Sequence, residues 1–409
     1  MTQDAPQRTE GFVNAAGGAL VAEDPTAPPF FPGLDGVRGL AMLAVFLTHT
    51  SYLTFAPESA YAVFLSQLNV GVLIFFMMSG FLMYRPYVVQ HLRHGDGLGT
   101  RSYFRRRFFR VYPGYWVALA GGLLIGFTTL DSPLAWIANV ALVQTYFTDL
   151  FGQGLPQAFT LVVEVSFYLL LPAFALLVRR VGGRLGPMRA EVGLVGLTTL
   201  LGFLGYAWYS FGDPPSALRV LPPWLGLIGA GMGLAVASAW AADQPRVPAV
   251  ARIGAARPWA WWGVAFVAWL AVVLFLGIDT QESLFASGKP GQAMGRYVLL
   301  TVTSAGLLVP LVFGAQQGGW VRRFAGWRPL TFLGSVSYGC YLWHYSVLWV
   351  LNDTWFGKYG VEGTFEKLVV TGLPITILLG WLSFRFVEQP AIRFGRSPRL
   401  RRRSARPGP

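Results

Sequence analysis

Residues 32–50 read PGLDGVRGLAMLAVFLTHT and place Arg38 and His49 in one apolar stretch. The two residues are eleven positions apart, which at about 100° per residue brings both side chains to the same face of a helix. At about 1.5 Å per residue, roughly 16 Å separates them along the helix axis. Arginine and histidine are costly inside a membrane and are therefore functional candidates there. This layout suits an anionic cofactor at one membrane surface and chemistry within the membrane.

The composition of the chain is that of a membrane protein. Of its 409 residues, 54% are hydrophobic and only 12% are charged, whereas soluble domains carry about 25% charged residues. The single cysteine, Cys340, excludes an intramolecular disulfide, and the four histidines show no metal-ligand spacing. We therefore expect no metal. The net charge of +13 is explained below by membrane topology, so we expect no nucleic-acid partner.

The hydropathy pattern predicts an all-α, polytopic membrane protein with about ten transmembrane helices, since a span needs about 20 mostly apolar residues. The segment 133–147 is apolar but short, and it is expected to be interfacial or re-entrant. The expected spans are roughly 36–55, 67–88, 112–130, 158–178, 191–210, 219–240, 259–277, 296–316, 331–351 and 368–388.

The distribution of basic residues predicts that both termini are cytoplasmic. With that orientation, the inner loops and the C-terminal tail hold 23 of the 32 Lys and Arg residues, and the outer loops hold 3. This asymmetry is a strong positive-inside signal. Residues 1–32 are polar and contain no signal-type apolar core. We expect a disordered cytoplasmic tail over 1–32, one membrane domain over 33–390 and a basic cytoplasmic tail over 391–409.

Three ionisable residues are expected at a similar depth in the membrane. His49, Glu164 and His344 each lie six or seven residues from the outer end of a predicted span, or roughly 9–11 Å below the outer surface. His49 is the candidate general base, because a neutral imidazole can take a proton from an attacking hydroxyl. Glu164 or His344 would orient His49 or the acceptor. The alternative is that these residues are polar groups that pack helices together.

The basic loop at 89–111 contains a candidate phosphate site. Arg107 and Arg110 are three residues apart and share a helix face, and arginine binds phosphate in a bidentate manner. The alternative, equally consistent with the spacing, is that these arginines only keep the loop on the cytoplasmic side of the membrane. Ser79 lies in span 2 without a nucleophile-elbow sequence, so helix packing is the favoured interpretation.

Four further polar residues are not assigned to the chemistry. His91 and His94 are expected to be solvated in a polar loop. Arg385 and Glu388, near the inner end of the last span, are expected to pair with each other or with the loop arginines.

Taken together, the motifs resemble those of the membrane acyltransferase-3 family. The first-helix stretch LDGVRGLAMLAVFLTH is similar to the family's arginine and histidine signature, and RRFFRVYPGYW resembles its RxxR segment. The other matching motifs, in chain order, are VGVLIFFMMSGFLM, FTLVVEVSFYLLLP, LGSVSYGCYLWHYSVL and FVEQPAIR. The resemblance covers the chain from about 33 to 394.

The resemblance implies O-acyl transfer from cytoplasmic acyl-CoA, acetyl-CoA or longer, to a hydroxyl of a cell-envelope glycan or glycolipid at the cell membrane. Direct attack and an acyl-histidine intermediate both remain open. Rival interpretations are acylation of a macrolide-like metabolite and transport of lipid-linked sugars. The oligomeric state is not predicted. The resemblance implies that Arg38 and His49 are essential and that Arg107 and Arg110 serve the donor. The full set of expected residues is His49, Arg38 and Glu164 for catalysis, Arg107, Arg110 and Arg38 for the donor, and His344, Ser79 and Tyr168 for the acceptor.

Overall fold

A computed structural model describes nine stretches of the chain, and nearly all of their residues are helical. The tail expected at 1–32 falls almost entirely outside them, as do residues 397–409. The described residues are 31–54, 60–95, 99–150, 152–211, 219–244, 246–276, 290–313, 319–356 and 364–396.

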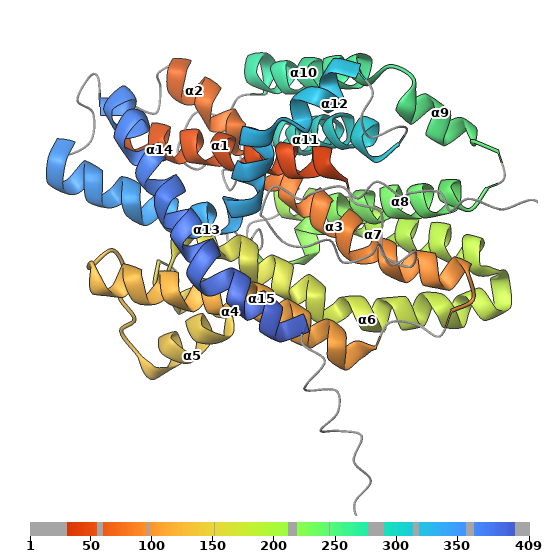
Figure 1. Ribbon diagram of the computed structural model, residues 1–409, viewed down its shortest axis with the longest axis horizontal. Helices are drawn as coiled ribbons and strands as arrows, with labels where there is room; N and C mark the ends of the chain where they lie inside the picture. Colours follow the sequence, from red (N-terminus) through yellow and green to blue (C-terminus); the bar gives the residue numbers. More distant parts are fainter. Residues whose placement is uncertain are drawn as a thin grey trace, which may run out of the picture. The chain divides into compact units, whose positions relative to one another are not determined.

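Among the described residues, ten helices have 18 residues or more, and each overlaps one of the ten expected spans (Figure 1). They are α1 (Pro32–Thr54), α3 (Val70–Leu92), α4 (Thr100–Leu124), α6 (Phe159–Leu185), α7 (Pro187–Phe211), α8 (Leu225–Ala242), α10 (Pro258–Phe275), α11 (Pro290–Val312), α13 (Arg328–Leu351) and α14 (Thr364–Ser383).

Shorter helices connect these ten or extend their ends. Helix α5 covers nine residues of the segment 133–147, too few to cross a membrane, as expected. The short α-helices are α2 (Ala60–Ser66), α5 (Pro133–Ala141), α9 (Ala249–Ala255), α12 (Gly319–Ala325) and α15 (Gln389–Arg396). The 3-10 turns are η1 (Gln67–Asn69), η2 (Gln144–Tyr146), η3 (Thr148–Leu150), η4 (Pro156–Ala158) and η6 (Pro222–Trp224), and the π-helical turns are η7 (Asn352–Phe356) and η8 (Phe384–Glu388).

The prediction of an all-α, multi-pass membrane protein is confirmed. Among the described residues, seven helical stretches are long and apolar enough to cross a membrane. Helices α1, α4 and α13 are long enough but less apolar, and they carry most of the polar candidate site residues. Helix α4 ends at Leu124, six residues before the expected end of its span. The count of ten spans and the cytoplasmic termini therefore stay predictions.

The start of the expected C-terminal tail is helical. Residues 391–396 belong to α15, which packs against α4 (Figure 1). The Phe394 ring lies 5.1 Å from the Phe109 ring. This contact connects the end of the last long helix to the arginine-rich helix α4.

Glycines allow α1 and α13 to pack unusually closely. A Cβ atom on Gly39 would lie 2.4 Å from the Leu330 carbonyl oxygen, and one on Gly334 would lie 1.9 Å from the Asp35 carbonyl oxygen. Membrane helices commonly use small residues for such close approach, because lipid tails supply no hydrophobic drive for association. The two helices run in the same direction from this contact toward their C-terminal ends, where His49 and His344 meet.

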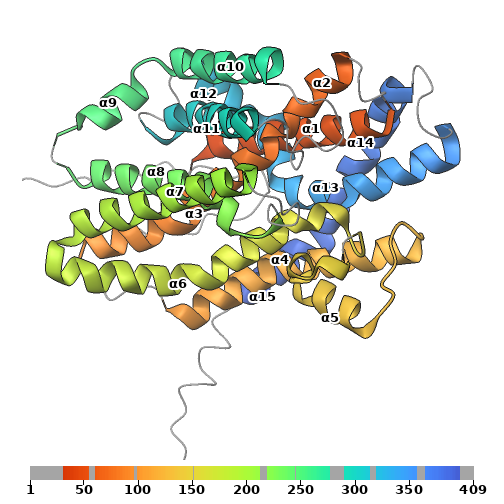
Figure 2. The same ribbon diagram turned by 180° about the vertical axis from the view of Figure 1, so that it is seen from behind.

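A second glycine contact joins α3 to α8. A Cβ atom on Gly80 would lie 2.0 Å from the Ile228 carbonyl oxygen, and one on Gly231 would lie 2.0 Å from the Met77 carbonyl oxygen. Helices α6, α7 and α8 follow one another side by side (Figure 2). Helix α3 is thereby held between α1 on one side and α8 on the other.

We predict that Gly39→Ala destabilises the protein by about 1–3 kcal/mol, because the added methyl group forces α1 away from α13. The measurement is the thermal unfolding midpoint of the purified protein in detergent. Gly193→Ala in α7 is the matched control, since a Cβ atom there meets nothing within 4 Å. A Gly39→Ala variant that unfolds no earlier than the control would contradict the packing argument.

Candidate active site

Six of the predicted site residues line one cavity of about 210 Å³. The cavity lies where α1, α3, α4, α6 and α13 meet, with α13 packed against both α1 and α4 (Figure 1). The predicted residues are Arg38, Ser79, Arg107, Arg110, Glu164 and Tyr168. The other lining residues are Val72, Phe75, Phe76, Met78, Leu82, Met83, Val111, Thr160, Leu161, Ser337, Tyr338 and Tyr341.

Three arginines give this cavity a surplus of positive charge. Arg38 Nη1 donates to Asp35 Oδ1 at 2.8 Å. Within the described residues, neither Arg107 nor Arg110 forms an ion pair within 4.0 Å. Arg107 lies over the Tyr168 ring, 5.6 Å from its centroid, and its Nε atom is buried with no hydrogen-bond partner in the described structure. Buried donors are usually satisfied, so this arrangement fits an anion.

The carboxylate of Glu164 in this cavity is held by two hydroxyl groups. The Ser79 hydroxyl donates to Glu164 Oε1 at 2.7 Å, and the Tyr168 hydroxyl donates to the same oxygen. The proton of Ser79 is therefore engaged, which disfavours Ser79 as a nucleophile. Because Glu164 is held by neutral donors rather than by an arginine, it does not cancel the charge of the arginine wall by direct pairing.

His49 and His344 form a hydrogen-bonded pair beyond the cavity. His344 Nε2 lies 3.0 Å from His49 Nδ1. His344 Nδ1 lies 2.6 Å from the Tyr341 carbonyl oxygen, which can only accept, so His344 Nδ1 carries a proton. In a neutral ring, His344 Nε2 is then the acceptor. His49 Nδ1 therefore donates, shared between His344 Nε2 and the Val45 carbonyl oxygen at 3.0 Å. The lone pair of His49 is left on Nε2.

The histidine pair lies one helical turn past one end of the cavity. On α13, Ser337, Tyr338 and Tyr341 line the cavity, and His344 follows Tyr341 by three residues on the same face. The Tyr341 hydroxyl is also hydrogen-bonded to Thr160 at 2.6 Å. The arginines and the histidines thus belong to opposite ends of one polar path along α13.

The sequence placed most of these residues in expected spans but did not identify all their partners. The loop expected at 89–111 is largely helical, because α4 begins at Thr100 and includes Arg107 and Arg110. In the described part of the chain, His344 contacts His49, whereas Glu164 is hydrogen-bonded to Ser79 and Tyr168. Tyr338 and Tyr341 were not singled out. Their spacing with His344, at three-residue intervals, was the available signal.

Comparison with known proteins identifies the family. Residues 31–385 match a model described as an acyltransferase domain, that of the acyltransferase-3 family. The chain belongs to the acyltransferase-3 family. The prediction made from the six motifs is confirmed.

Relatives of this acyltransferase-3 protein carry the names of O-acetyltransferases. It is 26% identical over 378 residues to "Putative peptidoglycan O-acetyltransferase YrhL" of Bacillus subtilis, with 88% of this chain and 55% of that protein covered. It is 23% identical over 388 residues to "Peptidoglycan O-acetyltransferase OatA" of Listeria monocytogenes, covering 88% and 56%. It is 23% identical over 387 residues to "O-acetyltransferase OatA" of Staphylococcus aureus, covering 89% and 57%. The chain therefore spans little more than half the length of these relatives. No solved structure matches it.

The structure corrects the expectation for His91. This side chain is buried rather than solvated, and its Nδ1 lies 2.7 Å from Glu191 Oε1. The other Glu191 oxygen accepts from the Tyr84 hydroxyl at 2.6 Å. Glu191 is 1% exposed, so this cluster joins α3 to α7 away from the cavity. His94 is exposed, as expected.

The expected pairing of Glu388 is also corrected. Glu388 is 1% exposed and accepts from the Ser383 hydroxyl at 3.3 Å. Arg385 is exposed and lies 3.4 Å from Gln389 Oε1 instead. Among the residues that the structure describes, Glu388 has no ion pair within 4.0 Å. The described residues also contain no group of three or more His, Cys, Asp or Glu side chains that could hold a metal ion.

We predict that Glu191→Ala lowers the free energy of unfolding by about 1–3 kcal/mol, since it leaves buried Tyr84 and His91 polar groups without their acceptor. The turnover of the protein that remains folded should not change, because the cluster does not line the cavity. Chemical or thermal unfolding in detergent gives the stability. Glu366→Ala, at an exposed carboxylate, is the control. Loss of turnover per folded molecule in Glu191→Ala would contradict a purely structural role.

Proposed function

We propose that this protein moves an acyl group from cytoplasmic acyl-CoA to a hydroxyl group of a cell-envelope glycan or glycolipid at the plasma membrane. The observation that supports this most is the polar path along α13. It has an anion-binding arginine wall at one end and a histidine with a free lone pair at the other. An acyl transferase that uses a polyphosphate donor needs both features.

The arginine wall supports a donor that carries phosphate groups. Arg107 and Arg110 lie in α4 among the basic residues expected on the cytoplasmic side. Guanidinium groups bind phosphate through charge-assisted hydrogen bonds. The buried Arg107 Nε offers a donor that nothing in the described chain uses. In this proposal the phosphates of acyl-CoA bind there, and the thioester points toward the histidines.

The histidine pair supports general-base catalysis. His49 Nε2 takes the proton of the acceptor hydroxyl as its oxygen attacks the thioester carbonyl carbon. The new C–O bond forms, the C–S bond breaks, and the proton passes from His49 to the thiolate of the departing coenzyme A. His344 does not touch the reacting atoms. It holds the His49 ring so that Nε2, rather than Nδ1, carries the lone pair.

The acceptor is proposed from the relatives. Their names refer to O-acetylation, and two of the three specify peptidoglycan. A glycan hydroxyl meets the chemical requirement of the site, which is a neutral nucleophile that becomes reactive on losing a proton. The small size of the cavity, about 210 Å³, favours acetyl over a long acyl chain.

The direct test uses the purified protein with acetyl-CoA and peptidoglycan fragments. The proposal predicts the release of free coenzyme A thiol together with an acetyl ester on the fragment, detected by mass spectrometry. Thiol release that is equally fast without any acceptor, and no ester on any glycan, would contradict the assignment.

We predict that Arg107→Ala with Arg110→Ala raises the KM for the donor more than the KM for the acceptor. Two lost charge-assisted contacts at about 1.5–3 kcal/mol each correspond to a weakening of at least about a hundredfold. Lysine at both positions should restore only part of the affinity, because it lacks the planar fork. Arg393→Ala, at an exposed arginine of α15, is the control. An unchanged donor KM in the double variant would mean that these arginines do not bind the donor and only set the membrane orientation.

We predict that His49→Ala abolishes turnover and that His344→Ala lowers kcat by about 10²–10⁴-fold, the range that a correctly placed general base contributes. His344→Gln should recover part of the loss, since its amide oxygen can accept from His49 Nδ1. Thermal unfolding checks that each variant is folded. If His344→Gln were no more active than His344→Ala, the hydrogen bond to His49 would not be the reason for the loss.

A further inference from the structure

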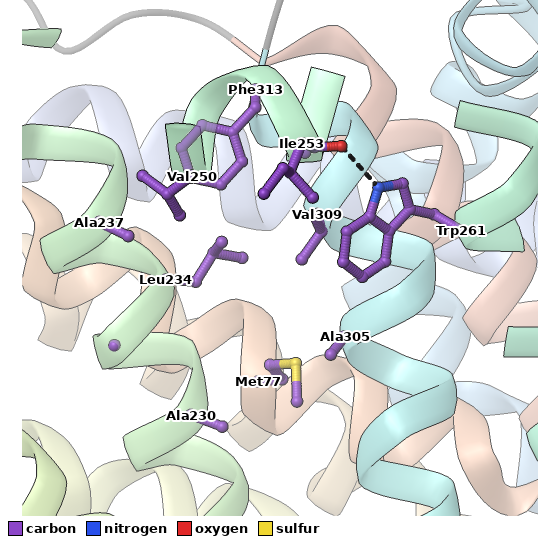
Figure 3. A pocket seen from close by; sticks show the side chains of 12 residues that line it. Met77, Ala230, Leu234, Ala237, Val250, Ile253, Trp261, Ala305, Val309 and Phe313 are labelled. Carbon is purple, nitrogen blue, oxygen red and sulfur yellow. Dashed lines mark hydrogen bonds between the residues drawn. The ribbon is translucent and has the colours of Figure 1, made fainter. Parts of the chain in front are cut away.

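Two apolar hollows lie on either side of α8, apart from the candidate active site. The first has a volume of about 510 Å³, and its lining is apolar throughout. Figure 3 shows its side chains around an open space, with the Trp261 indole donating to the Ile253 carbonyl oxygen at 3.1 Å. The lining residues are Met77, Ala230, Gly233, Leu234, Ala237, Val250, Ile253, Gly254, Trp261, Ala305, Val309 and Phe313.

The second hollow, of about 580 Å³, lies between α7 and α8. It shares Ala230, Gly233 and Ala237 with the first, so this row of small residues on α8 is the ridge between the two. Each hollow falls within the range of about 300–1,000 Å³ for small-molecule sites. Two elongated apolar groups could lie along α8, one on each side of the ridge.

The length of the second hollow matches one leaflet of a membrane. The α8 lining of the second hollow runs from Gly229 to Trp240, which is roughly 16 Å at about 1.5 Å per residue, and that of the first runs from Ala230 to Ala237, which is roughly 10 Å. Half of the hydrocarbon thickness of a bilayer is about 15 Å. Trp240 and Trp261 lie at the same end, where aromatic side chains mark the border between hydrocarbon and headgroups.

Exposed arginines surround that end. Arg189, Arg246, Arg252 and Arg257 are all exposed, and each is within four residues of a residue that lines a hollow. Asp243, the acidic residue of the loop between α8 and α9, is 3.5 Å from Arg93. The end of the hollows is therefore positively charged, which attracts anionic headgroups.

We propose that the two hollows bind the two acyl chains of one anionic phospholipid, with its phosphate among these arginines. The charge argues for an anionic headgroup, and the shared ridge argues for two chains. The site does not belong to the candidate active site. Met77 on α3 faces the first hollow, whereas Met78 and Ser79 face the active-site cavity. Helix α3 is thus a wall between them.

The test is native mass spectrometry after exchange into vesicles that contain phosphatidylglycerol and phosphatidylcholine in equal amounts. The purified protein is re-extracted in mild detergent, and the lipid that remains bound is identified. The proposal predicts one retained phosphatidylglycerol per protein molecule. Equal retention of phosphatidylcholine, or retention of neither lipid, would overturn it.

Two glycine variants test the location. Gly233→Phe fills the hollows, because a Cβ atom at Gly233 meets nothing within 4 Å, and it should abolish retention. Gly263→Phe on α10 is the matched control, since its Cβ atom also meets nothing within 4 Å and it lines neither hollow. It should retain lipid like the unaltered protein. The same retention in both variants would overturn the site.

Charge variants test the headgroup without altering the helices. Arg252→Gln should weaken phosphatidylglycerol binding about fivefold, the effect of one arginine near an anionic surface. Arg393→Gln, at an exposed arginine of α15, should leave it unchanged. The comparison of Arg252→Gln with Arg393→Gln also tests the lipid site if Gly233→Phe fails to fold. Equal binding by the two arginine variants would contradict a phosphate at this end.

Discussion

The contact between α1 and α13 is the constraint on which the candidate site depends. Gly39 and Gly334 let the two backbones approach until a methyl group no longer fits between them. From there the helices run in the same direction, and ten residues after each of these glycines come His49 and His344, whose rings meet at 3.0 Å. A wider spacing of α1 and α13 would break this hydrogen bond and leave a buried imidazole unsatisfied. The close packing of α1 and α13 therefore also positions the histidine pair.

Around that contact, the ionisable groups of the membrane domain fall into two kinds. Some are fully engaged, such as Glu191 between Tyr84 and His91, and these tie helices together. Others have buried hydrogen-bond donors without a partner in the described structure, such as Arg107 at its Nε atom. Because an unsatisfied charge is costly in a low-dielectric interior, such a donor at a cavity indicates a ligand. This distinction separates structural from functional candidates better than burial alone.

Much of the architecture could be predicted from the sequence. Each of the ten expected spans overlaps a long helix, because a helix satisfies the backbone polar groups of a membrane-spanning segment internally. Arg38, Ser79, Glu164 and Tyr168 were placed in expected spans. Arg107 and Arg110 were placed in a basic loop, but they belong to α4, which begins at Thr100. All six residues line one cavity. Their meeting point was not derivable, since spacing within one helix does not say which helices are neighbours. The pairing of His49 with His344, 295 residues apart, depends on that neighbourhood. His91 was misjudged for the same reason, because its partner Glu191 lies on another helix, 100 residues away.

The central claim is that one polar path carries the acyl group from an arginine wall on one side of the membrane to a histidine pair nearer the other side. The most direct measurement uses sealed vesicles in which the protein has a single orientation. Acetyl-CoA is added only on the side of α15 and the arginine-rich half of α4, and the glycan acceptor only on the opposite side. The account predicts acetyl ester in the acceptor compartment, with free coenzyme A on the donor side. Ester formation only when donor and acceptor share a compartment would contradict it.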